Sequence, residues 1–365
     1  MRARPRDLGV VLGTLEPGPR NTIGDVGEVR VGHVTLVSGE GRLVPGKGPV
    51  RTGVTVVVPH RGNVYEDRPK AAWDTINGCG ELAGALEIRE FGVIKTPIGL
   101  TNTNGVGSVQ SGLVEAALEA NAISGIDDDA IIATVSECDD SFLNDIRGMH
   151  VRPSHVKDAL RVATERFEHG SVGAGTGMCA YDFKAGIGSA SRRLGASDGA
   201  WTVGALVNLN VWDGDTFTIA GVPVTRELGR TGMIPGGAPP GGSIVIVLAT
   251  DAPLSSRQLG RIARRGFHGL GRVGSVSYSG SGDISIAFST AQWVPHDAPK
   301  EPMRERKLHE SQLNPLFVAA VEATEEAIVD ALFTATTVVG RDGNTSLELP
   351  IPQTLEILDR YGRLA

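Results

Sequence analysis

The chain alternates short apolar stretches with turns that are rich in glycine and proline. Short continuous apolar runs, or apolar residues that alternate with polar ones, predict strands. Apolar residues spaced three and four positions apart predict helices. Strands are expected at 23–37, 54–59, 130–138, 201–211, 216–224, 244–249 and 281–288. Helices are expected at 81–91, 110–122, 154–168, 251–266 and 315–334. Strands come from both ends of the chain without regular βαβ alternation, so the pattern predicts an α+β fold of stacked sheets covered by helices.

Local signals refine the ends of these elements. Asp251 is expected to cap the helix that ends at Gly266, and Asn314 to cap the last helix, because both side chains accept hydrogen bonds from first-turn amides. The arginine-rich stretch of the 251–266 helix is expected to be a solvated face rather than an anion site. Residues 195–199 fit a G-x-S-x-G pattern, but a strand follows them instead of a helix, so they predict a hairpin turn.

Length, charge and cysteine content narrow the class of protein. The chain has 365 residues, 41% of them hydrophobic, and no charged or serine-rich linker, which favours one domain over 1–365. The net charge of −7 argues against a nucleic-acid surface. We expect a cytoplasmic protein without a membrane partner, because no apolar stretch approaches the roughly 18–20 residues that span a bilayer and no secretion signal is recognisable. Three widely spaced cysteines and eight scattered histidines predict reduced thiols and no metal site.

One serine stands where a loop of glycine and proline changes abruptly into an apolar run. Residues 229–254 read GRTGMIPGGAPPGGSIVIVLATDAPL, and Ser243 opens the run. Gly242 has no Cβ, so its carbonyl can be approached closely, and attack by Ser243 Oγ would cut the Gly242–Ser243 bond. The product would carry a hydroxyl and an α-amine on one residue, and an amine with a pKa of about 7.7–8.0 can act as the general base. From spacing alone, an incidental serine before a core strand is the alternative.

Four other polar residues lie at the ends of expected strands. Glu137 could hold a substrate ammonium group, or belong to a surface turn of acids. The carboxamide of Asn210 could donate to a developing oxyanion, or form a turn. Ser281 and Asp283 are two residues apart, so an extended chain projects both to one face, where they could reach the amine or hydroxyl of Ser243. A simple Gly-Ser-Gly-Asp turn is the alternative for that pair.

Five blocks, in order along the chain, carry a resemblance to a known family. They are GLTNTNGVGS at 99–108, SECDDSFLNDIRGMHV at 136–151, GSIVIVLATDAPL at 242–254, SGSGDISIAFSTA at 279–291 and ALFTATTVVGRDG at 331–343. Together they resemble the L-aminopeptidase D-Ala-esterase/amidase family, the DmpA-type peptidases that include β-peptidyl aminopeptidases. The resemblance implies a four-layer αββα sandwich of the N-terminal-nucleophile-hydrolase kind, which ornithine acetyltransferases share. It also implies self-cleavage into 1–242 and 243–365, and assembly into a homo-oligomer, a tetramer of processed heterodimers.

The resemblance further implies a role for each candidate residue. Ser243 matches the nucleophile that self-cleavage frees, and Asn210 matches the oxyanion-hole residue. Glu137 matches the glutamate associated with the amino group of the substrate. Ser281 and Asp283 match a serine and an acid that complete the active site, although that acid is Glu in some members, so Asp283 has a shorter reach.

The implied activity is release of N-terminal residues from small peptides, amino-acid amides or esters, with no cofactor. Phe142 stands where some relatives have Tyr or Trp, and Ser141 where Gly is usual, so the resemblance leaves the preferred substrate size open. One alternative is an acyltransferase of the ornithine acetyltransferase type, although those relatives use a threonine nucleophile. Another is a non-catalytic small-molecule-binding protein on the same scaffold, which would not need Ser243, Ser281 and Asp283 together.

Overall fold

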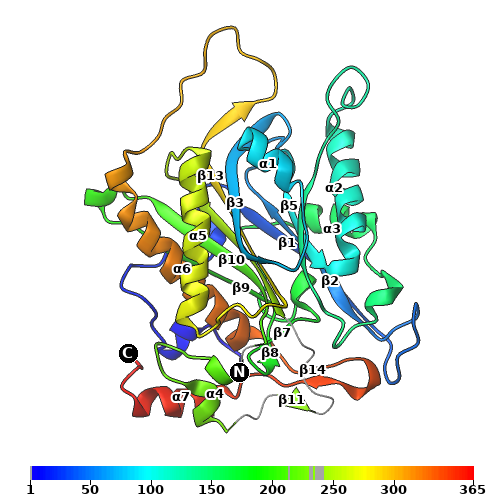
Figure 1. The fold of residues 1–365 in the computed structure, drawn as a ribbon, viewed down its shortest axis with the longest axis vertical. Coiled ribbons are helices and arrows are strands. Elements are labelled where there is room, and N and C mark those ends of the chain that lie inside the picture. The colour runs from blue at the N-terminus through cyan, green and yellow to red at the C-terminus, as the bar shows by residue number, and fades with distance from the viewer. Residues whose placement is uncertain (1, 213, 230–232, 235–241) are drawn as a thin grey trace.

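A computed structural model describes residues 2–212, 214–229, 233–234 and 242–365 (Figure 1). Most of the glycine- and proline-rich loop before Ser243, at 230–232 and 235–241, lies outside the described residues, so its expected irregular backbone stays a prediction. The described chain forms two five-stranded sheets, two small sheets and seven α-helices.

The two large sheets draw strands from both ends of the chain. In spatial order, the first sheet contains β1 (Arg30–Ser38), β2 (Val50–Val58), β5 (Ile98–Asn102), β6 (Thr134–Cys138) and β4 (Leu82–Ala83). The second contains β3 (Asp67–Gly78), β13 (Ser281–Pro295), β12 (Gly242–Thr250), β10 (Thr202–Asn210) and β9 (Ile187–Arg193). The small sheets contain β7 (Cys179–Ala180), β8 (Phe183–Lys184), β11 (Met233–Ile234), β14 (Val338–Val339) and β15 (Thr345–Ser346).

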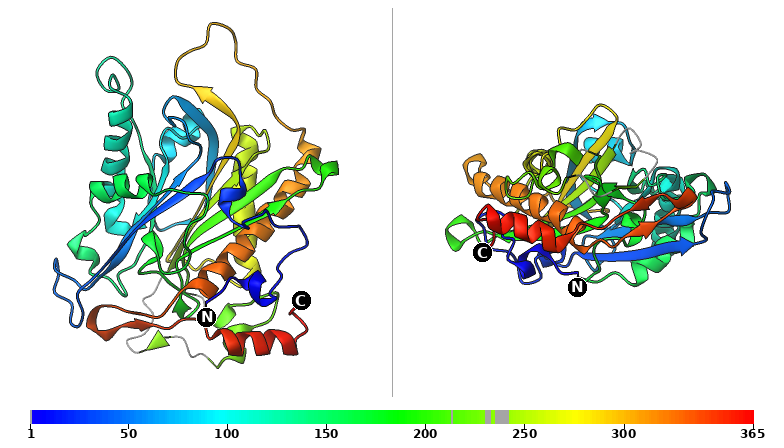
Figure 2. Two further views of the ribbon diagram at one scale, coloured as in Figure 1. Left: turned by 180° about the vertical axis from the view of Figure 1, so that it is seen from behind. Right: turned by 90° about the horizontal axis from the view of Figure 1, so that it is seen from below.

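Helices pack on the outer faces of the large sheets. The helices are α1 (Ala85–Phe91), α2 (Val106–Ala120), α3 (Pro153–Arg161), α4 (Val224–Glu227), α5 (Ser256–Arg272), α6 (Asn314–Thr334) and α7 (Ile351–Arg360). The pair α2 and α3 covers the first sheet, and the pair α5 and α6 covers the second (Figures 1 and 2). No described helix combines the length and the apolar composition needed to cross a membrane.

Three apolar cores separate the layers. The central core lies between the two sheets and includes Ile98 and Val245. A second core, with Val54, lies between the first sheet and its helices. A third, with Ile246, lies between the second sheet and its helices. Because successive side chains of a strand point to opposite faces, β12 supplies Val245 to one core and Ile246 to the next. The four-layer αββα arrangement is therefore confirmed.

The start of α6 and both ends of α5 differ from the prediction. Asn314 is the first residue of α6 itself, and no side-chain hydrogen bond caps that helix. Helix α5 is capped by Ser255, whose side chain accepts from Gln258 N, while Asp251 instead accepts from Thr202 N at 2.7 Å. The helix also continues past Gly266 to Arg272. A Cβ on Gly266 would lie only 3.2 Å from atoms of Ile246, so this glycine permits close approach of the helix to the sheet and does not end it.

Several expected elements are wrong in part. The strand expected at 23–37 starts only at Arg30, and the helix expected at 81–91 starts only at Ala85, because Leu82–Ala83 form β4. Residues 216–224 form no strand; they make one isolated bridge between Ile219 and Val222 and lead into α4. Their alternation arises because Phe217 and Ile219 are buried in the core without joining a sheet. The helix expected at 154–168 ends at Arg161, since Thr164 then bridges to Val31 of β1. The hairpin turn at 195–199 is confirmed, because it connects the antiparallel strands β9 and β10.

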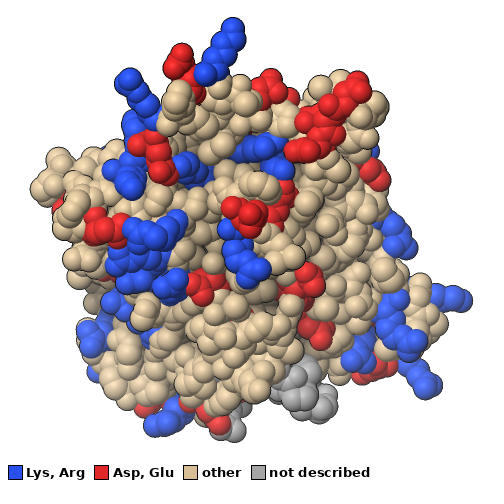
Figure 3. Space-filling model, turned by 45° about the horizontal axis from the view of Figure 1, so that its top comes forward, with Lys and Arg blue, Asp and Glu red and all other residues tan. Residues whose placement is uncertain are grey.

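Basic and acidic residues lie close together on the surface shown in Figure 3. On the outer side of α5, Arg257 and Arg261 pair with Glu310, and Arg264 pairs with Asp74. Arg257 and Arg264 are well exposed, so the expected solvated face is confirmed. Exposed pairs of this kind contribute little to stability.

A row of acids on α6 instead pairs with basic residues that are buried or half-buried. Glu322, Glu326 and Asp330 follow one another at four-residue spacing, so they share one face of the helix. Arg192 of β9 lies 2.6 Å from Glu326, and Arg4 lies 2.8 Å from Asp330. The same Asp330 accepts from His169 Nδ1 at 2.5 Å. These contacts fix the N-terminal arm and the second sheet against α6.

We expect Asp330→Asn to remove an acid-dependent part of the stability. Burial alone would raise the pKa of Asp330, but the charges of His169 and Arg4 overcome it and hold the pKa at about 2. A lowered carboxyl pKa stabilises the folded state above the unfolded pKa of about 3.9, by roughly 2–3 kcal/mol, and that stability is lost as pH falls toward 2. Urea unfolding between pH 2 and 6 measures it. Asp127→Asn, on an exposed turn, is the control; identical pH dependence in wild type and Asp330→Asn would contradict the prediction.

Candidate active site

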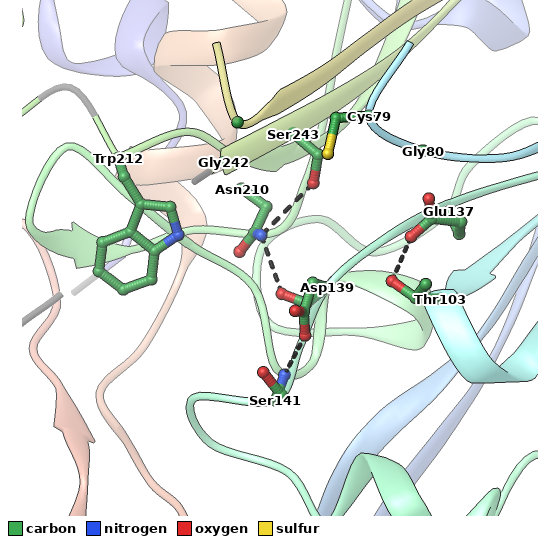
Figure 4. Close-up of a pocket in the computed structure, with 11 residues that line it drawn as sticks. Cys79, Gly80, Thr103, Glu137, Asp139, Ser141, Asn210, Trp212, Gly242 and Ser243 are labelled. Atoms are coloured by element: carbon green, nitrogen blue, oxygen red, sulfur yellow. Dashed lines mark hydrogen bonds between the residues drawn. The ribbon is translucent and has the colours of Figure 1, made fainter. Parts of the chain in front are cut away.

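Ser243 lies at the start of β12, beside a cavity between the two large sheets. It faces Asn210 of β10 on one side and Gly282 of β13 on the other. The cavity has a volume of about 400 Å³, and Ser243 is only 5% exposed (Figure 4). Its lining residues are Cys79, Gly80, Thr103, Glu137, Asp139, Ser141, Asn210, Trp212, Gly242, Ser243 and Gly280.

Gly242 is tightly enclosed where the chain enters this cavity. A Cβ at this position would lie 3.0 Å from the backbone nitrogen of Trp212 and 3.2 Å from the carbonyl oxygen of Asn210. A larger residue would therefore displace the backbone next to Ser243. The need for a small residue here follows from this close approach.

The Asn210 carboxamide is fixed on both sides. Its Oδ1 accepts from Cys179 N at 3.0 Å, and its Nδ2 donates to Asp139 O at 2.9 Å. The same Nδ2 lies 3.5 Å from Ser243 Oγ (Figure 4). A buried, pre-oriented N–H group beside a hydroxyl is well placed to stabilise negative charge that develops on an oxygen bonded to the attacked carbon.

Ser281 and Asp283 form a buried pair on the neighbouring strand. Ser281 Oγ donates to Asp283 Oδ1 at 2.8 Å, and Asn77 Nδ2 donates to Asp283 Oδ2 at 3.2 Å. Ser243 pairs with Gly282, and strand alternation therefore points the pair to the sheet face opposite the Ser243 hydroxyl. Ser281 itself pairs with Gly242. The backbone nitrogen of Ser243, which lies in the plane of the sheet, is thus the group that this pair can approach.

Glu137 lies across the cavity, at the end of β6 in the other sheet (Figure 4). It is 3% exposed, its Oε1 accepts from Glu81 N at 2.9 Å, and its Oε2 accepts from the Thr103 hydroxyl. Burial raises the pKa of Glu137, although both hydrogen bonds oppose the shift. A buried carboxylate in the wall of the cavity suits a ligand that carries an ammonium group.

Phe142 and Ser141 occupy different positions relative to the cavity. Ser141 lines it, whereas Phe142 packs behind Trp212, with ring centroids 5.7 Å apart and an edge-to-face angle of 79°. Trp212 is the aromatic residue that borders the cavity. Phe142 therefore acts on cavity shape through Trp212.

Sequence reasoning missed Thr103, Cys79 and Trp212. Thr103 follows β5, which runs parallel to β6 in a register that pairs Thr101 with Glu137. Its only signal was its place in the 99–108 block. Cys79 was noted only as a thiol, and Trp212 lies two residues past Asn210 with no motif of its own. Three-dimensional packing brings all three to the cavity.

Comparison with known proteins gives one consistent result. The profile of peptidase family S58 matches residues 21–346. The β-peptidyl aminopeptidase BapA of Sphingosinicella microcystinivorans is 39% identical over 376 residues, covering 99% of this chain and 93% of that protein. The solved structure of the PH0078 protein from Pyrococcus horikoshii is 48% identical, with a TM-score of 0.95 and coverage of 99% and 100%.

A second solved structure carries a functional description. The L-aminopeptidase D-Ala-esterase/amidase from Ochrobactrum anthropi is 36% identical, with a TM-score of 0.90 and 99% coverage of both chains. It is described as a prototype for the serine aminopeptidases and as a new variant of the Ntn hydrolase fold. The likeness therefore extends over nearly the whole chain in both sequence and structure.

Proposed function

This chain belongs to peptidase family S58 and is a serine aminopeptidase, and we propose that Ser243 is its nucleophile, freed by cleavage of the Gly242–Ser243 bond. The observation that carries this proposal is the position of Asn210 Nδ2, 3.5 Å from Ser243 Oγ in the cavity that also contains Glu137. Nucleophile, oxyanion donor and amine-binding carboxylate thus border one space.

Self-cleavage would use the same attacking oxygen, Ser243 Oγ, as later turnover. Ser243 Oγ loses its proton and attacks the Gly242 carbonyl carbon; the C–N bond then breaks, and the Ser243 nitrogen takes a proton to become an amine. Water hydrolyses the resulting ester and leaves a carboxylate on Gly242. Ser243 then carries both a free hydroxyl and an α-amine, and in this proposal Ser281 and Asp283 tune that amine.

In turnover, the Ser243 amine accepts the proton of the Ser243 hydroxyl as Oγ attacks the first carbonyl of the substrate. Asn210 donates to the oxyanion, and Glu137 binds the substrate ammonium group. The leaving amine takes the proton back as the substrate C–N bond breaks. Water then adds to the acyl-enzyme ester and releases the first residue of the substrate as a free acid.

The proposed substrates are small peptides, amino-acid amides and esters with a free amino terminus. The names of relatives, a β-peptidyl aminopeptidase and an L-aminopeptidase with D-Ala-esterase/amidase activity, support this class. Membership of a peptidase family favours hydrolysis over the acyltransferase and binding-protein alternatives. We also propose that the protein is cytoplasmic. Its proposed assembly is a homo-oligomer, a tetramer of processed heterodimers.

We expect the purified, denatured protein to contain two chains. Apportioning 38.2 kDa by residue count gives fragments of about 25 kDa and about 13 kDa for cleavage of one peptide bond. Intact-mass spectrometry measures them, and N-terminal sequencing should place Ser243 first in the smaller one. An uncut chain that nevertheless hydrolyses amino-acid amides would contradict the self-cleavage step.

A further inference from the structure

A fully buried lysine lies behind the cavity, outside the set of residues that the proposed reaction uses. Lys184 forms half of the two-residue strand β8, and none of it is exposed. Burying an ammonium group is unfavourable unless it is paired or fully hydrogen-bonded. Lys184 therefore needs compensating contacts, and these contacts lead to the active site.

Three backbone carbonyls surround the Lys184 ammonium group. Nζ donates to Gly175 O at 3.0 Å, to Met178 O at 2.7 Å and to Ala185 O at 2.6 Å. An ammonium group has three protons, so these bonds use all of them. Cys179 pairs with Lys184 across the β7–β8 ladder, which closes the segment around the charge.

One of these carbonyls belongs to the peptide that orients Asn210. The peptide unit between Met178 and Cys179 presents its C=O to Lys184 and its N–H to Asn210 Oδ1, at 3.0 Å. Asn210 Nδ2 in turn lies 3.5 Å from Ser243 Oγ. A continuous chain of hydrogen bonds thus runs from a buried positive charge, through one peptide and one carboxamide, to the nucleophile.

A second buried ionisable residue, Asp140, lies next to the peptide that holds the other side of the carboxamide. Asn210 Nδ2 donates to the carbonyl of the peptide between Asp139 and Asp140. Asp140 is fully buried, and its carboxylate accepts from Asn102 Nδ2 at 3.2 Å and from Asn144 Nδ2 at 2.9 Å. Both peptides that hold Asn210 are therefore anchored through groups buried away from solvent.

We propose that Lys184 is a positioning residue that orients and polarises the Asn210 carboxamide through the Met178–Cys179 peptide. Hydrogen bonds in a chain polarise one another, and the low dielectric of the interior strengthens the effect. The positive charge makes Asn210 Nδ2–H a stronger donor to the oxyanion that forms at Ser243. Burial lowers the pKa of Lys184 to about 8, while Cys179 and Asp140 oppose that shift, so the ammonium form persists at neutral pH.

The test is Lys184→Met, which keeps the length of the side chain and removes its charge. This inference rests on the proposed function, so kcat is calculated per molecule of cleaved enzyme. The inhibition constant of L-alaninol is measured on the same samples. Alaninol has the amine that Glu137 would bind but no carbonyl. We expect kcat to fall between about tenfold and 10²-fold, with alaninol inhibition unchanged within about twofold.

Lys95→Met is the matched control, since Lys95 is also buried but pairs with Glu87 of α1. It should leave kcat within about twofold of wild type. An unchanged kcat in Lys184→Met, or an equal loss of alaninol binding, would overturn the inference. If circular dichroism shows that Lys184→Met is unfolded, the same two measurements are made on Lys184→Gln. That variant removes the charge but keeps neutral N–H donors.

Asn210→Ala separates failure of this inference from failure of the proposed function. If Asn210→Ala retains the wild-type kcat, the proposed role of Asn210 is wrong and the role of Lys184 falls with it. If Asn210→Ala lowers kcat but removal of the Lys184 charge does not, only the role of Lys184 is wrong.

Discussion

Ser243→Ala should give a single uncut chain of 38.2 kDa with no measurable aminopeptidase activity. The substitution removes the oxygen that would attack both the Gly242 carbonyl and the substrate, so one change eliminates two reactions. Loss of a nucleophile that acts as part of a unit lowers kcat by about 10⁴-fold to 10⁶-fold in serine hydrolases. Intact mass and hydrolysis of alanyl p-nitroanilide measure the two effects on the same sample.

Ser289→Ala is the matched control for Ser243→Ala. Ser289 is a buried serine of β13 whose hydroxyl donates to Ala252 O at 2.7 Å, away from the cavity. Its loss should destabilise the fold slightly and leave self-cleavage and turnover intact. If Ser243→Ala hydrolysed the anilide like the parent, the proposed nucleophile would be wrong.

Glu137→Gln should lower kcat/KM by about 10²-fold to 10³-fold, chiefly through KM. Removing one member of a buried charge pair costs about 2–5 kcal/mol, and here the other member is the ammonium group of the substrate. Steady-state kinetics with alanyl p-nitroanilide measure the loss, and alaninol inhibition should weaken in parallel. Because burial raises the pKa of Glu137, the wild-type kcat/KM should fall in acid at a pH above the ordinary Glu pKa of about 4.3, as the carboxylate is protonated.

Self-cleavage should survive in Glu137→Gln, because that step binds no substrate amine. A fully processed variant would also show that the protein has folded. Glu81→Gln is the control, since Glu81 is exposed and its hydrogen bond to Glu137 comes from its backbone N–H, which the substitution keeps. An unchanged KM in Glu137→Gln, with alaninol inhibition intact, would refute the proposed contact with the substrate amine.

The two strands that hold Ser243 and Asn210 could be predicted from the local pattern of apolar residues. The apolar run after Ser243 predicted β12, and the run before Asn210 predicted β10, because buried strands leave a continuous apolar signature. The cap of α5 was mispredicted because two side chains compete: Asp251 binds the amide of Thr202 on another strand, and Ser255 takes the cap. That choice depends on tertiary contacts.

The site itself combines residues that no spacing rule connects. Glu137 and Ser243 lie in different sheets and meet only because the sheets stack, so the family resemblance, and not periodicity, brought them together. Lys184 illustrates the remaining limit. It is one polar residue in a two-residue strand, and its importance depends on which carbonyls surround it after folding.

The strand order of the second sheet determines how the proposed cleavage would affect refolding. The strands β12 and β13 follow the proposed cut, yet they lie between β3 and β10, which precede it. The two fragments would therefore be interleaved, held by backbone hydrogen bonds that cleavage leaves intact. Once unfolded, they would have to find each other again as separate molecules, so recovery would depend on concentration. A single precursor chain could refold alone, whereas unfolding of the cut protein would become irreversible at low concentration, so its persistence would depend on how slowly it unfolds.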